Sequence, residues 1–235
     1  MSALKNRNLH RLFEHIQPYL HYSIPSDNKI PDGKVLVLSP NQQDWAIGCA
    51  GVLLKNARNS SSFEIVYCTS EGAQRMKESE KAASLLGIKR SHFFQFPNNG
   101  LKADKNFCGI LVKLFDKIQP ETVFLPFWFD NCPDHIALSR ALVKIRKDID
   151  LRFTVYAYGI WSPIIPNCVF DISAQWEAKK NIIERYEQTK NDWTALSQGI
   201  NQYWGAVMGH KMQYAEVFFT STASKYISLG RKILG

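Results

Sequence analysis

The sequence predicts an α/β fold: a single Rossmann-like domain in which helices flank a mainly parallel sheet. The first reason is the order of local patterns, because short runs rich in β-branched and aromatic residues alternate with longer segments of helical periodicity. The second is the composition of the 235 residues, of which 45% are hydrophobic and 21% charged, as is typical of globular domains. The apolar runs are short, so we expect no membrane-spanning segment.

Six segments are expected to form strands, and five longer segments are expected to form helices. The strands are Lys34–Leu38, Phe63–Cys68, His92–Phe96, Thr122–Leu125, Arg152–Ala157 and Cys168–Ile172. The helices are residues 44–57, 74–87, 105–118, 133–147 and 174–198. Gly87 is expected to cap the second helix, because glycine adopts the left-handed conformation that often ends a helix. Pro120 separates the third helix from the strand that begins at Thr122.

Residues 1–33 are expected to form a helical extension and a loop before the α/β domain of residues 34–235. Apolar side chains recur at helical spacing in this extension. They are Leu9, Leu12, Phe13, Ile16 and Leu20. Two interpretations remain open: this stripe docks on the core of the domain, or it lies on an anionic membrane surface.

The chain is basic, with 29 Lys and Arg against 21 Asp and Glu and a formal net charge of +8. The excess is spread along the sequence without a nucleic-acid-binding motif, which favours a solvated basic surface over a nucleic-acid partner. Five scattered cysteines form no C-x-x-C pair, and Met1–His10 has no apolar signal core. We therefore expect a cytoplasmic location, with the N-terminal helix as a potential peripheral contact to the inner membrane face.

Ligands of open α/β sheets bind beyond the carboxyl ends of the strands, so chemistry is expected in the loops that follow them. The loop after the first strand contains Asn41-Gln-Gln-Asp-Trp45, and the loop after the fourth contains Asp130-Asn-Cys-Pro-Asp-His135. Together these loops resemble the PIG-L/LmbE family of zinc-dependent N-deacetylases, whose motifs are His-Pro-Asp-Asp-Glu and Asp-x-His-x-Asp-His. The resemblance extends over residues 34–220 and includes Thr69–Gly72 and Arg75.

The resemblance implies a Rossmann-like fold, zinc as cofactor, and an amino sugar or glycan conjugate as ligand, including lipid- or nucleotide-linked sugars. Within the first motif, Asn41 replaces a metal-binding His and Gln42 replaces the Pro. Gln43 replaces the Asp that serves as general base, whereas Asp44 keeps the position of a metal ligand. Trp45 replaces the Glu.

The second motif is altered at one position. Asp130 and Asp134 are retained, and His135 matches the family's third metal ligand. Cys132 stands where the family has the His that stabilises the tetrahedral intermediate.

These departures remove much of the family's chemistry. Zinc needs about three protein ligands in an open catalytic site, and the neutral carbonyl of Asn41 suits calcium or magnesium better. The amide of Gln43 cannot accept a proton, and a positioned general base contributes about 10²–10⁴-fold to a rate. The sequence thus favours a degenerate member of the family, with a binding or partner role in place of zinc deacetylation.

A rebuilt metal site is the alternative hypothesis. Asp44, Cys132 and His135 would supply three zinc ligands, because thiolate is a strong zinc donor, and Asp134 would serve as the base. In that case the chain is an active N-deacetylase or amidase on an N-acylated amino sugar. The opposing interpretation is that Cys132 is a small buried side chain that binds no metal and takes part in no reaction.

Several side chains are candidates for contact with the sugar. They are Asn41, Gln43, Trp45, Arg75, Asn99 and Asp130. Trp45, Trp128 and Phe129 are expected at the mouth of the cleft, where aromatic faces stack on sugars. An equally good interpretation is that the Trp45 side chain fills the space left by the lost metal site. Arg75 matches a substrate-contacting position of the family or is a helix-surface arginine. The segment Asn98–Gly100 offers hydrogen bonds or simply makes a turn.

Overall fold

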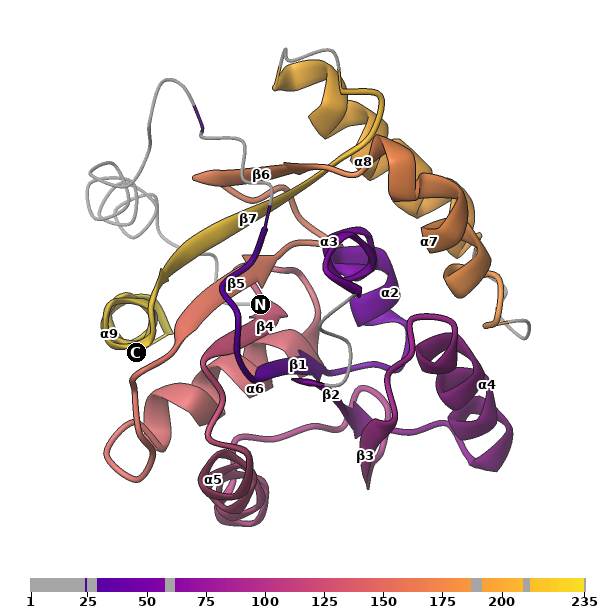
Figure 1. The fold of residues 1–235 in the computed structure, drawn as a ribbon. Coiled ribbons are helices and arrows are strands. Elements are labelled where there is room, and N and C mark those ends of the chain that lie inside the picture. Colours follow the sequence, from indigo (N-terminus) through magenta and orange to yellow (C-terminus); the bar gives the residue numbers. More distant parts are fainter. Residues whose placement is uncertain (1–23, 25–28, 58–61, 187–191, 209–211, 235) are drawn as a thin grey trace.

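Seven strands form one sheet in the order β3-β2-β1-β4-β5-β7-β6 (Figure 1). The structure is a computed structural model that describes residues 24, 29–57, 62–186, 192–208 and 212–234. The strands are β1 (Val35–Ser39), β2 (Phe63–Thr69), β3 (Arg90–Phe96), β4 (Thr122–Pro126), β5 (Thr154–Tyr158), β6 (Cys168–Asp171) and β7 (Ala215–Thr222). Strands β1 to β5 pair in parallel, and β7 runs antiparallel to β5 and β6. The expected mainly parallel α/β fold is confirmed.

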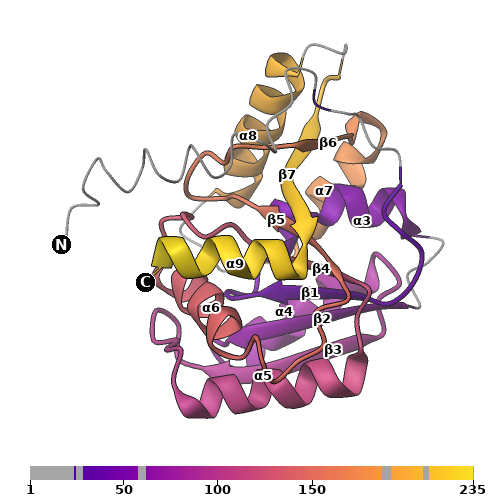
Figure 2. The same cartoon turned by 90° about the vertical axis from the view of Figure 1, so that its left-hand side faces the viewer.

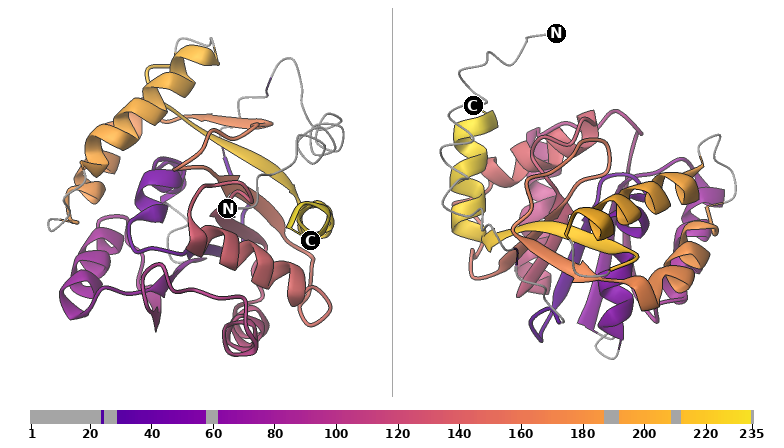
Figure 3. Two further views of the ribbon diagram at one scale, coloured as in Figure 1. Left: turned by 180° about the vertical axis from the view of Figure 1, so that it is seen from behind. Right: turned by 90° about the horizontal axis from the view of Figure 1, so that it is seen from above.

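Helices cover both faces of this sheet, because each strand buries alternate side chains on opposite sides. Val35 and Val37 of β1 enter one hydrophobic cluster, which α2 (Asp44–Gly48), α3 (Ala50–Lys55), α4 (Ala73–Ser84) and α7 (Trp176–Ile183) cover. Leu36 and Leu38 enter the other, under α5 (Lys105–Ile118), α6 (Pro133–Lys144) and α9 (Ala223–Leu234). Figure 2 shows α9 beside α6, and Figure 3 shows α7 and α8 (Trp193–Val207) toward the β6–β7 end of the sheet.

Some expected elements differ from the structure. The helix expected at 44–57 is two helices, because Cys49 leaves the helical region with φ −148°. The segment expected as one helix at 174–198 holds a short 3-10 turn (Ser173–Gln175), α7 and the start of α8, which is a separate helix capped by the Asp192 side chain. Strand β7 and helix α9 were not expected. The N-terminal helix expected before residue 24 lies outside the described residues.

The arrangement of β1 and β4 creates a place for a ligand. These strands are neighbours, but the chain continues from β1 toward β2 on one side and from β4 toward β5 on the other. The loops that leave their carboxyl ends therefore diverge, which is the usual position of a binding crevice in such sheets. Among the described residues, none of the helices has the length and apolar character needed to cross a bilayer.

Candidate functional site

The two altered motifs meet at this divergence between β1 and β4. The loop after β1 leads into α2, which begins at Asp44, and the loop after β4 leads into α6, which begins at Pro133. Asp44 therefore lies in the first turn of α2, and Asp134 and His135 lie in the first turn of α6. All three side chains are fully buried.

His135 lies between two carboxylates. Its Nε2 is 2.9 Å from Oδ2 of Asp44, and its Nδ1 is 2.9 Å from Oδ2 of Asp130. The backbone N–H of Asn41 donates to the same Asp44 oxygen at 2.6 Å. The second oxygen, Oδ1 of Asp44, is buried and has no hydrogen-bond partner in the part of the chain that the structure describes. The two side chains that match metal ligands are thus bonded to each other.

Asp130 is held by the loop that follows β5. The backbone N–H groups of Trp161 and Ser162 donate to its Oδ1 at 2.6 and 2.8 Å, and that of Ile160 donates to Oδ2 at 3.0 Å. Three backbone N–H groups and the imidazole of His135 thus hold the Asp130 carboxylate in place.

The charge state of His135 follows from these neighbours. Burial alone lowers the pKa of its imidazole, but the charge of Asp44 and the hydrogen bonds to Asp130 and Asp44 outweigh that effect. Its pKa is held well above the ordinary value of 6.5. The two carboxylates beside the ring thus favour the protonated form of His135.

Asn41 and Cys132 face each other across the two loops. The Nδ2 of Asn41 donates to Sγ of Cys132 at 3.7 Å, and its Oδ1 accepts from the Thr69 hydroxyl at 3.1 Å. The amide oxygen that replaces a metal-binding imidazole is therefore already engaged with the protein. Both residues are buried, with 9% of Asn41 and 7% of Cys132 exposed.

This set of donors does not fit zinc. Among the described residues, no three His, Cys, Asp or Glu side chains are placed together to hold a metal ion. The amide oxygen of Asn41 is a poor zinc ligand and already accepts a hydrogen bond from the Thr69 hydroxyl. Oδ1 of Asp44 is a buried oxygen without a partner, but one such atom does not make a three-ligand site.

Asp134 anchors a neighbouring loop. Its Oδ2 accepts from the backbone N–H of Asn99 at 2.9 Å, and its Oδ1 accepts from that of Leu101 at 3.0 Å. Burial raises the pKa of this carboxyl, and the two backbone hydrogen bonds only partly oppose the rise. Both oxygens hold the loop after β3 against the start of α6, while the side chain of Asn99 lies on the exposed surface.

The expectation that Trp45 and Trp128 lie at the mouth of a cleft is wrong. Trp45 is fully buried and its Nε1 donates to the Tyr186 hydroxyl at 2.9 Å. Trp128 is 1% exposed and stacks on Tyr226 with ring centroids 4.1 Å apart. Phe129 is partly buried and packs against the hydrophobic cluster beneath α5, α6 and α9. Large apolar rings gain most by complete burial, so Trp45 acts as a core side chain.

Arg75 of α4 is buried, not a surface arginine. Its Nη1 donates to Oε2 of Glu78 at 3.0 Å, and its guanidinium lies 5.3 Å from the centre of the Tyr186 ring. Its Nε is 3.6 Å from a carboxylate oxygen of Glu71. Gln42, from the first motif, donates to the Ser79 hydroxyl on the same helix at 3.2 Å. Gln42 and Ser79 thereby tie the first loop to α4, while Arg75 is 7% exposed and bonds within the protein.

Gln43 is buried as well and is 8% exposed.

Sequence reasoning missed the loop of residues 159–162. Its contribution is made by backbone N–H groups, which any residue type supplies, so no side-chain motif marks it. The available signal was its position, because it follows β5 at the same edge of the sheet as the two motifs. Tyr186 was missed too, although it contacts Trp45, Arg75 and the backbone carbonyl of Gln42.

Comparison with known proteins finds a matching family domain, a related sequence and similar structures. The sequence pattern of PIG-L, GlcNAc-PI de-N-acetylase, matches residues 36–146, which include both motifs. A diacetylchitobiose deacetylase of Thermococcus kodakarensis is 27% identical over 220 residues, covering 78% of this chain and 81% of that protein. Diacetylchitobiose deacetylase of Pyrococcus horikoshii has the same fold, with a TM-score of 0.70 at 20% identity over 96% of both chains.

A conserved protein of Thermus thermophilus is similar in structure as well, with a TM-score of 0.69, 25% identity, and coverage of 80% of this chain and 94% of that one. The family match places both altered motifs within one PIG-L (LmbE-like) domain, and the chain is homologous to diacetylchitobiose deacetylase.

Proposed function

We propose that this chain is a non-hydrolytic PIG-L protein that binds an amino-sugar or glycan conjugate, or partners an enzyme that acts on one. The observation that carries the proposal is the 2.9 Å hydrogen bond between Nε2 of His135 and Oδ2 of Asp44. These atoms occupy the positions of two metal ligands of the family, and here they satisfy each other.

Loss of the general base supports the same conclusion. Gln43 stands at the position of the family's catalytic Asp, and its amide has no basicity at neutral pH. Asp134, the base of the alternative hypothesis, already accepts two backbone hydrogen bonds. Hydrolysis by the family mechanism would therefore lack both the metal and the proton acceptor.

The ligand class rests on homology and on polar groups at the edge of the site. The similarity to diacetylchitobiose deacetylase over 220 residues supports an amino-sugar ligand. Asn98 and Asn99 are exposed beside the site, and Nδ2 of Asn98 donates to Oε1 of Glu71 at 2.6 Å. Amide and carboxylate groups in this arrangement offer hydrogen bonds to sugar hydroxyls. The cytoplasmic location and the contact with the inner membrane face are parts of this proposal.

Metal content and activity of the full chain test the proposal directly. The protein is purified, incubated with zinc, and measured by elemental mass spectrometry beside Asp44→Asn. We expect no stoichiometric zinc in either protein and no release of acetate from N,N'-diacetylchitobiose or N-acetylglucosamine. Near-stoichiometric zinc that disappears in Asp44→Asn, together with acetate release, would overturn the proposal in favour of the rebuilt metal site.

A restored variant provides the positive control. Asn41→His, Gln43→Asp and Cys132→His are combined, which returns the missing ligand, the base and the second His of the motifs. We expect this variant to bind zinc, because Asp44 and the new His then join His135 as ligands. Zinc binding by the restored variant but not by the natural chain shows that the fold accepts the metal and that the substitutions exclude it.

Ligand binding is measured separately from catalysis. Binding of diacetylchitobiose and of N-acetylglucosamine conjugates is followed by isothermal titration calorimetry. We expect saturable binding without turnover, weakened at least tenfold in Asn98→Ala/Asn99→Ala. Absence of binding to every amino-sugar probe would contradict the ligand class while leaving the loss of hydrolysis intact.

A further inference from the structure

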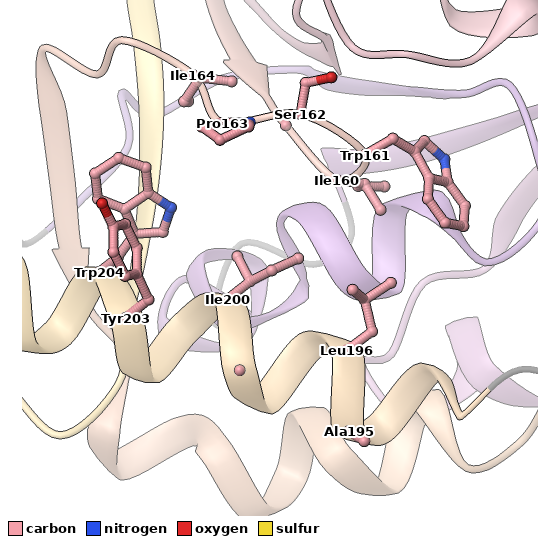
Figure 4. Close-up of a pocket in the computed structure, with 12 residues that line it drawn as sticks. Ile160, Trp161, Ser162, Pro163, Ile164, Ala195, Leu196, Ile200, Tyr203 and Trp204 are labelled. Atoms are coloured by element: carbon pink, nitrogen blue, oxygen red, sulfur yellow. The ribbon is translucent and has the colours of Figure 1, made fainter.

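Two cavities border the loops around the candidate site, and their linings differ in charge. The first, of about 630 Å³, lies between the loop after β5 and helix α8, where Figure 4 shows Ile160 and Trp161 across from Ile200. Its lining residues are apolar, aromatic, glycine or serine, so no charged group there selects a ligand. The second, of about 650 Å³, lies between the loop after β3 and helix α6, and charged side chains line it. We call this second cavity the α6 groove.

The α6 groove combines an apolar surface with basic side chains. Leu101 and Ala137 are buried beneath it, with 5% and 8% of their surfaces exposed. Lys102, Arg140 and Lys144 line the groove as exposed residues. The further lining residues are Ala103, Asp104, Pro133 and Ile136, of which Asp104 alone is acidic. Among the described residues, three cationic side chains therefore border the groove beside one carboxylate.

These three cations have no ion-pair partner in the part of the chain that the structure describes. The carboxylate of Asp104 instead caps helix α5, where its Oδ1 accepts the backbone N–H of Phe107 at 2.9 Å. The ammonium of Lys144 donates to the backbone carbonyl of Ala103, which joins the two walls of the groove. The groove thus presents cationic groups that are not paired with a carboxylate of the described residues.

Arg140 and Lys144 lie four residues apart on α6, so they are neighbours on one face of the helix. Like charges at this spacing repel each other. A bound anion with several oxygens would relieve the repulsion by accepting hydrogen bonds from both side chains. The planar guanidinium of Arg140 matches two oxygens of a phosphate, and Lys144 adds a second positive charge.

We infer that the α6 groove binds a small organic phosphate, with its phosphoryl group on Arg140 and Lys144 and its uncharged body on the apolar surface. A phosphate monoester carries about −1.5 to −2 charge at pH 7, which suits two adjacent cations better than a single carboxylate does. A cavity of about 650 Å³ lies in the usual range for small-molecule sites and leaves room for more than a phosphate ion. Asp44, Asp130 and His135 do not line the groove, so the inference goes beyond the proposed function.

The groove nevertheless shares a loop with the candidate site. Leu101 lines the groove, and its backbone N–H donates to Oδ1 of Asp134 at 3.0 Å. The N–H of Asn99, in the same loop, donates to Oδ2 of Asp134 at 2.9 Å. A ligand that contacts both this loop and α6 stabilises the junction that Asp134 makes between them.

The test titrates 1-naphthyl phosphate into the full chain by isothermal calorimetry at low salt, beside inorganic phosphate, 1-naphthoate and 1-naphthol. We expect saturable binding of 1-naphthyl phosphate. Inorganic phosphate lacks the organic body and 1-naphthoate carries one charge, so both should bind about tenfold more weakly, and 1-naphthol should not bind at the groove. Equal affinity for inorganic phosphate would mean an adventitious ion only, and no binding of 1-naphthyl phosphate would overturn the inference outright.

The variant Arg140→Gln/Lys144→Gln removes the two cations, and Lys113→Gln/Lys117→Gln on α5 is its matched control. Both pairs are exposed, lie four residues apart and remove two positive charges, but neither lysine of α5 lines the groove. We expect about a tenfold or larger loss of 1-naphthyl phosphate binding in the α6 variant and less than about a twofold loss in the control. Urea denaturation verifies that both variants are folded. Equal losses would show attraction by net charge alone and would contradict a site at the groove.

Macromolecular anions give different results. If the groove belongs to a nucleic-acid-binding face, a single-stranded oligonucleotide binds, the α6 variant loses that binding, and 1-naphthyl phosphate does not bind. If the groove rests on an anionic membrane, phosphatidylglycerol vesicles replace the oligonucleotide in that pattern. Either result overturns the small-ligand inference, and neither bears on the zinc and acetate measurements that test the proposed function.

Discussion

Two buried charged clusters stand close together in this protein, and they are built very differently. The first joins Asp44, His135 and Asp130 at the altered motifs. The second joins Lys179 of α7 to Glu216 of β7 at 2.7 Å, with both side chains essentially inaccessible to solvent.

The second cluster leaves no polar atom of its ion pair without a partner. Lys179 donates to the carbonyl of Ile47, to Oδ1 of Asn201 and to Oε1 of Glu216, at 2.7, 2.8 and 2.7 Å. Glu216 also accepts the N–H groups of Gly51 and Val52 at 2.8 and 2.7 Å, in the first turn of α3. A buried ion pair stabilises a fold only when hydrogen bonds engage its charged atoms, as they do here.

The first cluster instead keeps an unpaired oxygen, Oδ1 of Asp44. The second cluster ties α3, α7 and α8 to the sheet. The contrast supports the proposal that the Asp44–His135 cluster is an altered reaction site, and it indicates that the Lys179–Glu216 cluster is part of the framework.

Removing Lys179 should give the largest effect. Lys179→Met leaves Glu216 buried without its cation, which typically costs about 3–5 kcal/mol. We expect this loss in the free energy of unfolding measured by urea denaturation. Lys179→Met/Glu216→Gln should recover part of it, because no isolated charge then remains. Lys180→Met, at the partly exposed neighbouring position, is the control, and an equal loss there would contradict the structural role of the buried pair.

Asp44→Asn should cost less. The amide oxygen still accepts the N–H of Asn41, but His135 loses one of its two carboxylate partners, so we expect a loss of about 1–3 kcal/mol. Urea denaturation at pH 7 measures the change. A loss as large as that of Lys179→Met would show that the two clusters stabilise the fold equally, which would contradict the proposed difference between them.

The pH dependence of stability isolates His135. Its folded pKa is raised, so its contribution is fully present below the unfolded value of about 6.5 and is lost as pH rises toward the folded pKa. The slope approaches about 1.4 kcal/mol per pH unit for one proton. We expect the difference in unfolding free energy between the natural chain and His135→Gln to shrink from pH 6 to pH 9. A constant difference over that range would mean that His135 is neutral in the folded protein.

The fold was largely predictable because its signals are local. Helix α5 matches the expected residues 105–118, since Asp104 caps its start and Pro120 follows its end. Strand β7 and helix α9 were missed, and the antiparallel direction of β7 is set by its partners β5 and β6, which no local pattern reveals. Residues 174–198 were predicted as one helix because the helical pattern of the sequence is similar before the end of α7 and after the start of α8.

The candidate site was predictable only in part. Motif spacing correctly brought Asp44 and His135 together, because the loops after neighbouring parallel strands meet at one edge of the sheet. It did not reveal that the two side chains hydrogen-bond to each other, since that depends on side-chain orientation, which motif spacing does not give. The burial of Trp45 was not predictable either, because a tryptophan beside a motif can either stack on a sugar or fill the hydrophobic core.

A partly exposed ion pair between β2 and the edge strand β3 should give the smallest effect, and it sharpens the contrast with the fully buried clusters. Glu64 accepts from Arg90 at 2.9 Å and lies 2.8 Å from Nε2 of His92. Burial raises the pKa of Glu64, but the hydrogen bonds from His92 and Arg90 outweigh this and leave it lowered.

A lowered carboxyl pKa stabilises the fold above the unfolded value of about 4.5, and that contribution disappears as pH falls through the folded value. We therefore expect Glu64→Gln to cost less than about 1 kcal/mol at pH 7, because solvent screens partly exposed pairs, and to cost less at pH 3 than at pH 7. Urea denaturation at both values measures this. A loss at pH 7 matching that of Lys179→Met would mean that burial does not separate framework charges from surface ones, and the distinction between the two buried clusters would lose its physical basis.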